Sequence, residues 1–550
     1  MLNRKTLFSL RSLALVVSVI ALTGCDGCGP TSGASSSLEV VGVDAQVAVS
    51  TGDLVGTARS LASFVRSATE KSASMASSLQ TVTQSQLGFN PFEKAAYAEV
   101  GIDPKTGMAV FTEGDSTELV LALGITDQSK VNDWLLALLK RVDGASERSE
   151  RTVDGVKIFS VGRPFGTELV PVAHWTFVGS RILISPPQGE ASLIAAAKRL
   201  ADGTQKSLSS DSLYSEMNAK IPSDSVLRVF ARGGVSSVLT GSSQGEAAQA
   251  AMLGVTFDES SFASELFVKG ATGKLGQAMG DETPASLSPQ IADDAVFATM
   301  SAGARSEMLN ALKAHPVSGP PVASTLRTFK ERTGLDLEQD LVPLLSGPIT
   351  LAIYIENASR AMAAIQSGGR DPSAMLEAIH ASVTAKVKEP AAMAAVLDKA
   401  AERLRASGVA IERQDSERKG KPLIRFAPQQ PTVQLGWALY GNTYVYGAGA
   451  GRVDRMLDVL DGASPSLSLK DTSAEPISSK AGASLILIRL GVLGEKVRSL
   501  ANELGGAAGA AMFGQIVNSA VDVSKTLGDI AISVQVEPDG LRLQVRENLR

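Results

Sequence analysis

The sequence contains few of the residues that usually carry chemistry or covalent cross-links. Its 550 residues include only two cysteines and three histidines. Cys25 and Cys28 lie close together near the N-terminus, so the rest of the chain has no disulfide and must be stabilised by a hydrophobic core. The histidines, His174, His315 and His380, are far from the cysteines and from one another in sequence. We therefore expect no structural Cys/His metal site, and we assign no catalytic residue and no cofactor.

An excess of positive charge is also missing. The formal net charge is −5, and it becomes −8 if residues 1–24, which hold three basic and no acidic residues, are removed. Nucleic-acid-binding proteins need a basic surface, so we expect no nucleic-acid partner. No later segment reaches the 18 consecutive apolar residues that indicate a transmembrane helix, although the Ala/Gly-rich tract near residue 510 comes closest. These features predict a soluble body.

The N-terminus has the layout of a secretory signal peptide. Three basic residues precede an apolar run, Leu13–Leu22, which is too short to span a bilayer. The following Leu22-Thr23-Gly24-Cys25 resembles the bacterial lipobox, which implies that Cys25 becomes the lipidated first residue of the mature protein, acylated with chains such as palmitate. The alternative, a plain signal peptide that ends near a cysteine, leaves Cys25 unexplained.

The lipobox resemblance implies a membrane partner through the lipid on Cys25. We expect a protein of the cell envelope with a periplasmic or extracellular body. Asp26 is the residue type that retains enteric lipoproteins in the inner membrane, so the inner membrane is favoured slightly.

Two segments of the chain have the same pattern 262 positions apart. His174–Ser185 (HWTFVGSRILIS) and Gly436–Gly447 (GWALYGNTYVYG) both have Trp second, Gly sixth and a polar residue next. Glycine accepts the positive φ of a tight hairpin turn, so both segments predict a β-hairpin. The same shift relates two apolar sets with the spacing of a helix that buries one face. These sets are Val131, Trp134, Leu135, Leu138 and Leu139, and Met393, Val396, Leu397, Ala400 and Ala401.

Four further pairs of segments match in the same order, which predicts a duplicated domain. In each copy a strand and helix lead to a Gly-x-Asp corner, two strands, the amphipathic helix, a short strand, the Trp hairpin, a second helix, another strand, an Ala-rich helix and a closing hairpin. Because hairpins outnumber crossovers, we predict an α+β fold of two tandem copies, each a mainly antiparallel sheet with helices packed on one face. The predicted boundaries are a signal peptide at 1–24, a flexible tether at 25–39, a first repeat at 40–270, a linker at 271–290 and a second repeat at 291–550.

The segment Thr333–Ile355 (TGLDLEQDLVPLLSGPITLAIYI) has a Gly-Leu-Asp corner, an acidic connector, a Leu-Leu step and a strand. It resembles the family of uncharacterised bacterial envelope proteins known as domain of unknown function thirty-three fifty-two. The Asp-Ala strand openings at Asp44 and Asp294 are similar to that family's start. The first copy departs from the pattern, because Gly101-Ile102-Asp103 lacks the acidic connector. The resemblance implies export and often anchoring, but no reaction and no site residues.

Two short motifs have the form of catalytic or nucleotide-binding signatures. Gly241–Gly245 matches the G-x-S-x-G string of α/β-hydrolases with Ser243 as nucleophile, but the parallel α/β alternation that this turn needs is missing. A flexible helix entry is the favoured interpretation. Gly447–Gly451 (GAGAG) follows a strand and opens a helix, as phosphate-binding loops do. Its third glycine is one residue early for that motif, which favours a mobile strand-to-helix corner.

The remaining polar candidates favour structural roles. His174 is expected to lie in its strand beside a core tryptophan. The acidic residues Glu331, Asp336, Glu338 and Asp340 gather before a strand, where helix capping by Asp336 and Glu338 is favoured over acid/base chemistry.

The small residues of Leu504–Phe513 (LGGAAGAAMF) and Glu246–Leu253 (EAAQAAML) predict tightly packed helices or, alternatively, a shallow groove for an apolar ligand. We therefore predict a non-enzymatic, membrane-anchored envelope protein that binds or scaffolds a partner protein. The alternatives are a periplasmic carrier of a lipid or apolar ligand, and a serine hydrolase using Ser243.

Overall fold

A computed structural model shows two compact units, Met1–Thr240 with Ala247–Gly270 and Gly241–Glu246 with Ala271–Arg550. The structure describes residues 37–69, 83–114, 116–165, 168–204, 206–233, 248–258, 260–270, 280–303, 324, 327, 330–331, 334–357, 360–361, 377–429, 435–496 and 527–549. Each unit is described by itself. Residues 37–39, expected in the tether, are the first described residues, and Leu38 is buried in the core of the first unit.

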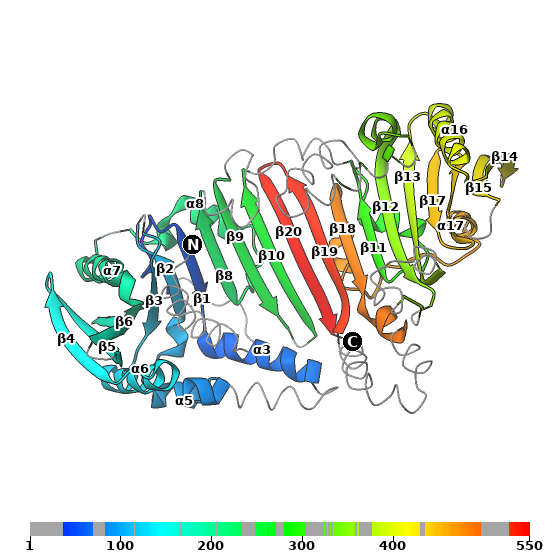
Figure 1. Ribbon diagram of the computed structural model, residues 1–550. Helices are drawn as coiled ribbons and strands as arrows, with labels where there is room; N and C mark the ends of the chain where they lie inside the picture. The colour runs from blue at the N-terminus through cyan, green and yellow to red at the C-terminus, as the bar shows by residue number, and fades with distance from the viewer. Residues whose placement is uncertain are drawn as a thin grey trace, which may run out of the picture. The chain divides into compact units, whose positions relative to one another are not determined.

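Among its described residues, the first unit has ten strands in one antiparallel sheet. Their order across the sheet is β4-β5-β6-β7-β3-β2-β1-β8-β9-β10 (Figure 1). The strands are β1 (Val47–Thr51), β2 (Met108–Thr112), β3 (Leu119–Gly124), β4 (Glu147–Val153), β5 (Val156–Phe165), β6 (Glu168–Val178), β7 (Arg181–Ser185), β8 (Leu227–Arg232), β9 (Ala250–Phe257) and β10 (Ser261–Lys269).

The described part of the second unit also has ten antiparallel strands. Their order is β14-β15-β16-β17-β13-β12-β11-β18-β19-β20, which repeats the order of the first unit strand for strand. The strands are β11 (Phe297–Ser301), β12 (Leu345–Ile355), β13 (Ile379–Val387), β14 (Ile411–Arg418), β15 (Lys421–Pro428), β16 (Leu435–Tyr440), β17 (Thr443–Ala448), β18 (Ala483–Arg489), β19 (Leu527–Glu537) and β20 (Gly540–Leu549). A mixed fold of helices and antiparallel sheet is therefore confirmed.

The helices lie mainly in the connections between these strands. The α-helices are α3 (Leu54–Thr69), α5 (Lys94–Glu99), α6 (Gln128–Asp143), α7 (Glu190–Asp202), α8 (Ser212–Asn218), α11 (Pro284–Leu287), α16 (Pro390–Ala406) and α17 (Arg452–Leu460). Short turns are η1 (Pro104–Thr106), η2 (Pro187–Gly189), η3 (Leu208–Ser210), η4 (Ser288–Gln290), η5 (Leu337–Leu341), η6 (Val342–Leu344) and η7 (Glu475–Ile477). Helix α11 lies within the expected linker, and its Leu287 is buried in the core of the second unit.

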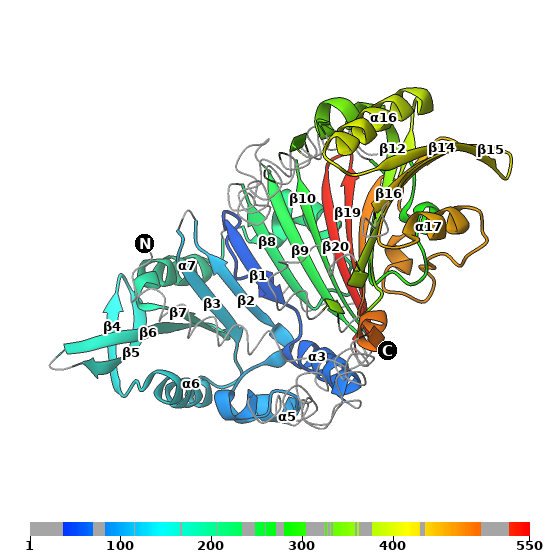
Figure 2. The same ribbon diagram turned by 45° about the vertical axis from the view of Figure 1, so that its right-hand side comes forward.

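The prediction that helices cover one face of each sheet is wrong. In the first unit α6 packs on the face that carries Leu121 and Leu123, and α7 packs on the opposite face with Val120 and Ala122 (Figure 2). In the second unit α16 and α17 divide the two faces in the same way. The physical reason is that β3 is apolar at successive positions, so both faces of the sheet must be covered.

One element type was assigned wrongly and two strands were missed. The segment expected to be an Ala-rich helix at 246–253 contains the start of β9, because Ala250 pairs with Lys269 in the closing hairpin. The missed strands, β4 and β14, are almost entirely exposed and charged, so neither has the apolar alternation that indicates a strand. In all three cases the pairing of strands in the sheet overrides the local sequence preference.

The two Trp hairpins share their register and their aromatic packing. Trp175 lies opposite Phe159 and Ile184, and Trp437 lies opposite Phe426 and Tyr446. Each tryptophan stacks on its phenylalanine with ring centroids 5.8 Å apart. The turn glycines have φ of 57° and 59°, which suits the twist of a tight hairpin. The same sheet position therefore carries the same aromatic pair in both units.

The hydrogen bonding of these tryptophans differs. Trp175 Nε1 donates to Asn132 Oδ1 of α6 at 3.3 Å, whereas the equivalent position in α16 is Ala394. Trp437 Nε1 is buried and has no partner among the described residues. We expect Asn132→Ala to lower the free energy of unfolding of the first unit by about 1–3 kcal/mol, because it leaves a buried indole N–H unpartnered.

Urea unfolding followed by tryptophan fluorescence measures this loss. The reciprocal substitution Ala394→Asn supplies an acceptor to Trp437 and serves as the matched control. It is expected to be neutral or stabilising by up to about 1 kcal/mol. A stability loss from Ala394→Asn as large as that from Asn132→Ala would show that the helix position, and not the hydrogen bond, decides the result.

Candidate functional site

Several residues singled out in the sequence lie outside the described residues. They are Cys25, Cys28, Ser243, His315 and the segment Leu504–Phe513. The structure does describe His174, His380, the glycine loop Gly447–Gly451 and the acidic corner at Asp336. Asp336 caps η5 by accepting hydrogen bonds from the backbone N–H groups of Glu338 and Gln339, as predicted for that residue.

His174 belongs to a buried polar cluster on the α7 face of the first sheet. Its Nδ1 lies 2.7 Å from Ser160 Oγ on β5, and its Nε2 lies 3.6 Å from Glu190, the first residue of α7. Glu190 also pairs with Arg151 of β4. Burial lowers the pKa of His174, an effect that outweighs the opposite influence of Glu190. The imidazole is therefore neutral at pH 7.

A hydroxyl, a neutral imidazole and a carboxylate in line are the groups of a nucleophilic triad. Here Ser160 is 8% exposed and His174 is 4% exposed, so a substrate cannot reach the hydroxyl in this conformation. The second unit has Ala427 beside Phe426 and Gly436 beside Trp437, where the first has Ser160 and His174. We interpret the cluster as a tie that holds α7 onto β5 and β6.

The second unit has a different polar cluster at the start of α17. Arg452, the first residue of the helix, is 3% exposed and lies 3.7 Å from the ring centroid of Tyr354. It pairs with Glu356, and its Nη2 is 3.6 Å from Asp294. Nδ1 of His380 lies 3.4 Å from Glu356, an ion-pair distance without the alignment of a hydrogen bond. The cluster ties α17 to β12 and β13.

The glycine loop before α17 owes its composition to close packing on this cluster. A Cβ on Gly449, whose φ is 114°, would lie 2.1 Å from the ring of His380. A Cβ on Gly447 would lie 2.8 Å from the backbone N of Val453. The imidazole thus fills the space beneath the loop where a phosphate-binding loop would need room for its ligand. Close packing at this strand-to-helix corner therefore explains why positions 447 and 449 are glycine.

Glu356 makes the second cluster pH-dependent. Contact with His380, followed by the charge of Arg452, lowers the pKa of Glu356 from 4.5 to about 2 against the opposing effect of burial. A depressed carboxyl pKa contributes stability above the unfolded-state value of 4.5, and this contribution is lost as the pH falls toward 2. The side chain is 39% exposed, so solvent screening reduces the contribution to about 1 kcal/mol.

We therefore expect Glu356→Gln to lower the urea midpoint of the second unit at pH 7. The difference from the parent should shrink steadily between pH 4.5 and pH 2. Urea titrations at pH 7, 5, 4 and 3 measure this dependence. Glu402→Gln on the exposed face of α16 is the control, and an equal pH dependence in that variant would contradict the account.

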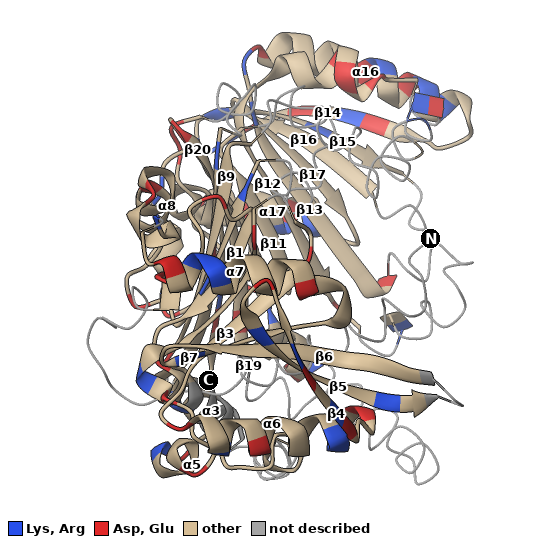
Figure 3. Cartoon of the chain, turned by 90° about the vertical axis from the view of Figure 1, so that its left-hand side faces the viewer, with Lys and Arg blue, Asp and Glu red and all other residues tan. Residues whose placement is uncertain are grey.

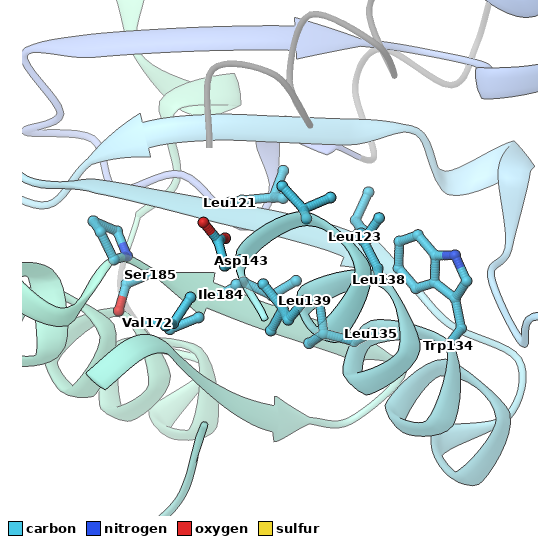
Figure 4. A pocket seen from close by; sticks show the side chains of 13 residues that line it. Leu121, Leu123, Trp134, Leu135, Leu138, Leu139, Asp143, Val172, Ile184 and Ser185 are labelled. Carbon is cyan, nitrogen blue, oxygen red and sulfur yellow. The ribbon is translucent and has the colours of Figure 1, made fainter. Parts of the chain in front are cut away.

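A small apolar cavity lies between α6 and the sheet of the first unit. Its volume is about 40 Å³, and Figure 4 shows leucines of α6 facing side chains of β3, β6 and β7 across it. The lining residues are Leu121, Leu123, Trp134, Leu135, Leu138, Leu139, Val142, Asp143, Val172, Ala173, Ile184, Ser185 and Pro186. Apolar cavities that bind benzene measure about 150 Å³, so an aromatic ring does not fit without movement of α6.

Sequence reasoning missed the partners in both polar clusters. Arg452 follows the glycine loop directly, but Glu356 and His380 lie far from it in sequence and meet it only because β12, β13 and β17 are neighbours. Nothing in the local sequence indicated that Arg452 would be buried at the start of a helix. Within the described residues, no cluster of His, Cys, Asp and Glu could hold a metal ion. The helices of the described chain include none that is long and apolar enough to cross a membrane.

No family model matches this chain, and neither does any curated protein. Among solved structures, crystal form I of TP0453 from Treponema is similar at 13% sequence identity. The match covers 44% of this chain and 79% of that chain, with a TM-score of 0.23. A likeness at that level carries no argument about fold or function.

Proposed function

We propose that this protein is a membrane-anchored envelope lipoprotein whose body is a duplicated, non-enzymatic binding or scaffold module. One contrast carries the proposal. The two units have the same strand order and the same Trp–Phe stack, whereas the polar groups at the start of α7 and α17 differ in identity and in partners. A sheet that is the same in both units, with different polar groups at the helix starts, is expected of a binding module. Such a module depends on its fold rather than on a reactive group.

A duplication of one domain would explain why the two sheets share their register. Val120 pairs with Phe111, and Ser382, which is 262 positions later, pairs with Ala352 at the corresponding place. Ile184 and Tyr446, also 262 positions apart, pair with Leu121 and Val383. The shift first noted between the Trp hairpins thus extends through β3, β7, β13 and β17. These pairings support two copies of one domain.

The proposed anchor is a lipid on Cys25, supported by the Leu22–Cys25 motif and the apolar run before it. The inner membrane remains slightly favoured by Asp26. The resemblance of Thr333–Ile355 to an uncharacterised envelope family stays a prediction. The lipobox motif and this resemblance both support a body in the periplasm or outside the cell, where its partner would be another envelope protein.

The test is purification from the native membrane in mild detergent, followed by mass spectrometry of co-purifying proteins and extractable lipids. Cys25→Ser is the control for the anchor and is expected to move the protein out of the membrane fraction. A stoichiometric protein partner supports the scaffold. A Cys25→Ser protein that stays fully membrane-bound, or a parent without any partner, would contradict the proposal.

A second candidate, a carrier of a lipid or apolar ligand, requires movement of α6, because the cavity beneath this helix is too small for an aromatic ring. Ala173, which is 6% exposed, lines the cavity, so Ala173→Val adds two methyl groups to it. If the cavity is a packing defect, the substitution should raise stability by up to about 1 kcal/mol and change nothing else. If it is a ligand site, a co-purifying apolar molecule should be present in the parent and lost in the variant.

A further inference from the structure

Strand β4 presents an exposed edge in the first unit. It pairs with β5 on one side, and no described strand pairs with its other side. All of its residues are exposed except Val153, which is half-buried. Figure 3 shows Lys or Arg and Asp or Glu interleaved along this strand. A free edge of this kind can pair with a strand of another chain unless its side chains prevent it.

The charges of β4 are self-complementary under two-fold symmetry. Its first five residues, Glu147 to Arg151, read Glu-Arg-Ser-Glu-Arg. If two copies of β4 pair in antiparallel orientation about Ser149, Glu147 lies opposite Arg151 and Arg148 lies opposite Glu150. Every opposed pair then has opposite charge, which stabilises neighbouring strands, whereas like charges in these places would destabilise them. A closed two-fold contact uses the same patch on both chains.

Strand β14, at the equivalent edge of the second unit, lacks this property. Pairing two copies about Asp415 places that aspartate against itself, and pairing about Gln414 places Ile411 opposite Glu417. Both strands are exposed and charged, so a general need for a polar edge does not explain the difference between them. Of these two strands, only β4 has charges that are complementary to those of a second copy of itself.

Contacts within the unit hold the charged side chains in place along β4. Arg151 pairs with Glu190 on one face of the ribbon. On the other face the guanidinium of Arg148 lies 5.0 Å from the ring centroid of Phe159, and Lys157 Nζ lies 3.2 Å from Glu150. Side chains positioned in this way lose less conformational entropy when a second strand arrives.

We propose that β4 is a homodimerisation edge that pairs antiparallel with β4 of a second copy of this chain, with Ser149 on the two-fold axis. The interface is short and its charge pairs are exposed, so the dimer is weak and weakens with salt. The proposal does not depend on the lipid anchor or on any other partner.

Disulfide trapping in the full chain tests the pairing. Residues opposed across an antiparallel pair have Cα atoms about 4.5–5.5 Å apart, within the range of a disulfide. In a Cys28→Ser background, Ser149→Cys should form a disulfide-linked dimer under mild oxidation. Thr152→Cys is the matched control on the same strand, because its two copies would lie about 20 Å apart. The background protein alone reports any cross-link through Cys25.

Charge exchange tests the reason for the pairing. Arg148→Glu places glutamates opposite each other twice per dimer and should reduce the Ser149→Cys cross-link at least fivefold. The double exchange Arg148→Glu/Glu150→Arg restores complementarity and should return the yield to within twofold of the parent. Equal cross-linking at positions 149 and 152, no cross-link at 149, or indifference to Arg148→Glu would each overturn the proposal. Circular dichroism checks that every variant is folded.

Discussion

Replacing Trp175 with alanine is expected to lower the free energy of unfolding of the first unit by about 3–5 kcal/mol. Trp175 is fully buried, stacks on Phe159 and hydrogen bonds to Asn132, so it joins β5, β6 and α6 at one point. Truncation removes the aromatic pair, leaves a cavity and removes the donor to Asn132. Urea unfolding in a Trp437→Phe background measures the loss, because the remaining fluorescence comes from Trp134 in the same unit.

Two controls separate the role of Trp175 from a general sensitivity of the core. Trp175→Phe keeps an aromatic ring on Phe159 and should cost less than half as much. Trp437→Ala removes the equivalent ring and should destabilise the second unit while leaving the first unchanged. A loss below about 1 kcal/mol in Trp175→Ala would contradict the central place given to the Trp hairpin in each sheet.

Arg452→Ala should lower the free energy of unfolding of the second unit by about 3 kcal/mol. The guanidinium is buried over Tyr354 and is paired with Glu356 and Asp294. Removing the guanidinium eliminates the cation–π contact with Tyr354 and leaves the carboxylates of Glu356 and Asp294 without this cation. Both carboxylates remain partly exposed, which keeps the cost near the lower end of the range for a broken buried ion pair. Fluorescence of Trp437 follows the unfolding of this unit.

The matched control for Arg452 is Arg425→Ala in the same unit. Arg425 pairs with Asp454 of α17 at 2.8 Å, but both side chains are about a third or more exposed. Exposed ion pairs contribute at most about 1 kcal/mol, so this variant should be nearly neutral. If the two variants lost equal stability, burial of Arg452 could not be the cause.

Elements with strong apolar periodicity were predictable from the sequence. The helix at Val131–Leu139 is α6, its counterpart at Met393–Ala401 is α16, and both Trp hairpins were placed correctly. Each of these helices and strands buries apolar side chains at a regular spacing, and this spacing can be recognised within a short stretch of sequence.

What the sequence could not predict depends on contacts between distant segments. Strands β4 and β14 form because β5 and β15 provide their backbone hydrogen-bond partners. The exposed side chains of β4 and β14 have no alternating apolar pattern that would indicate this pairing. The cluster around Arg452 needs β12, β13 and α17 side by side before any of its members has a partner. Which face each helix covers likewise follows from the connections of the whole sheet rather than from the helices.

The most direct test of the proposed anchored module is the mass of the N-terminal peptide of the protein purified from its native membrane. The account predicts a peptide that begins at Cys25 and carries a diacylglyceryl group, with no peptide from residues 1–24. An unmodified Cys25, or a mature N-terminus at another residue, would contradict it.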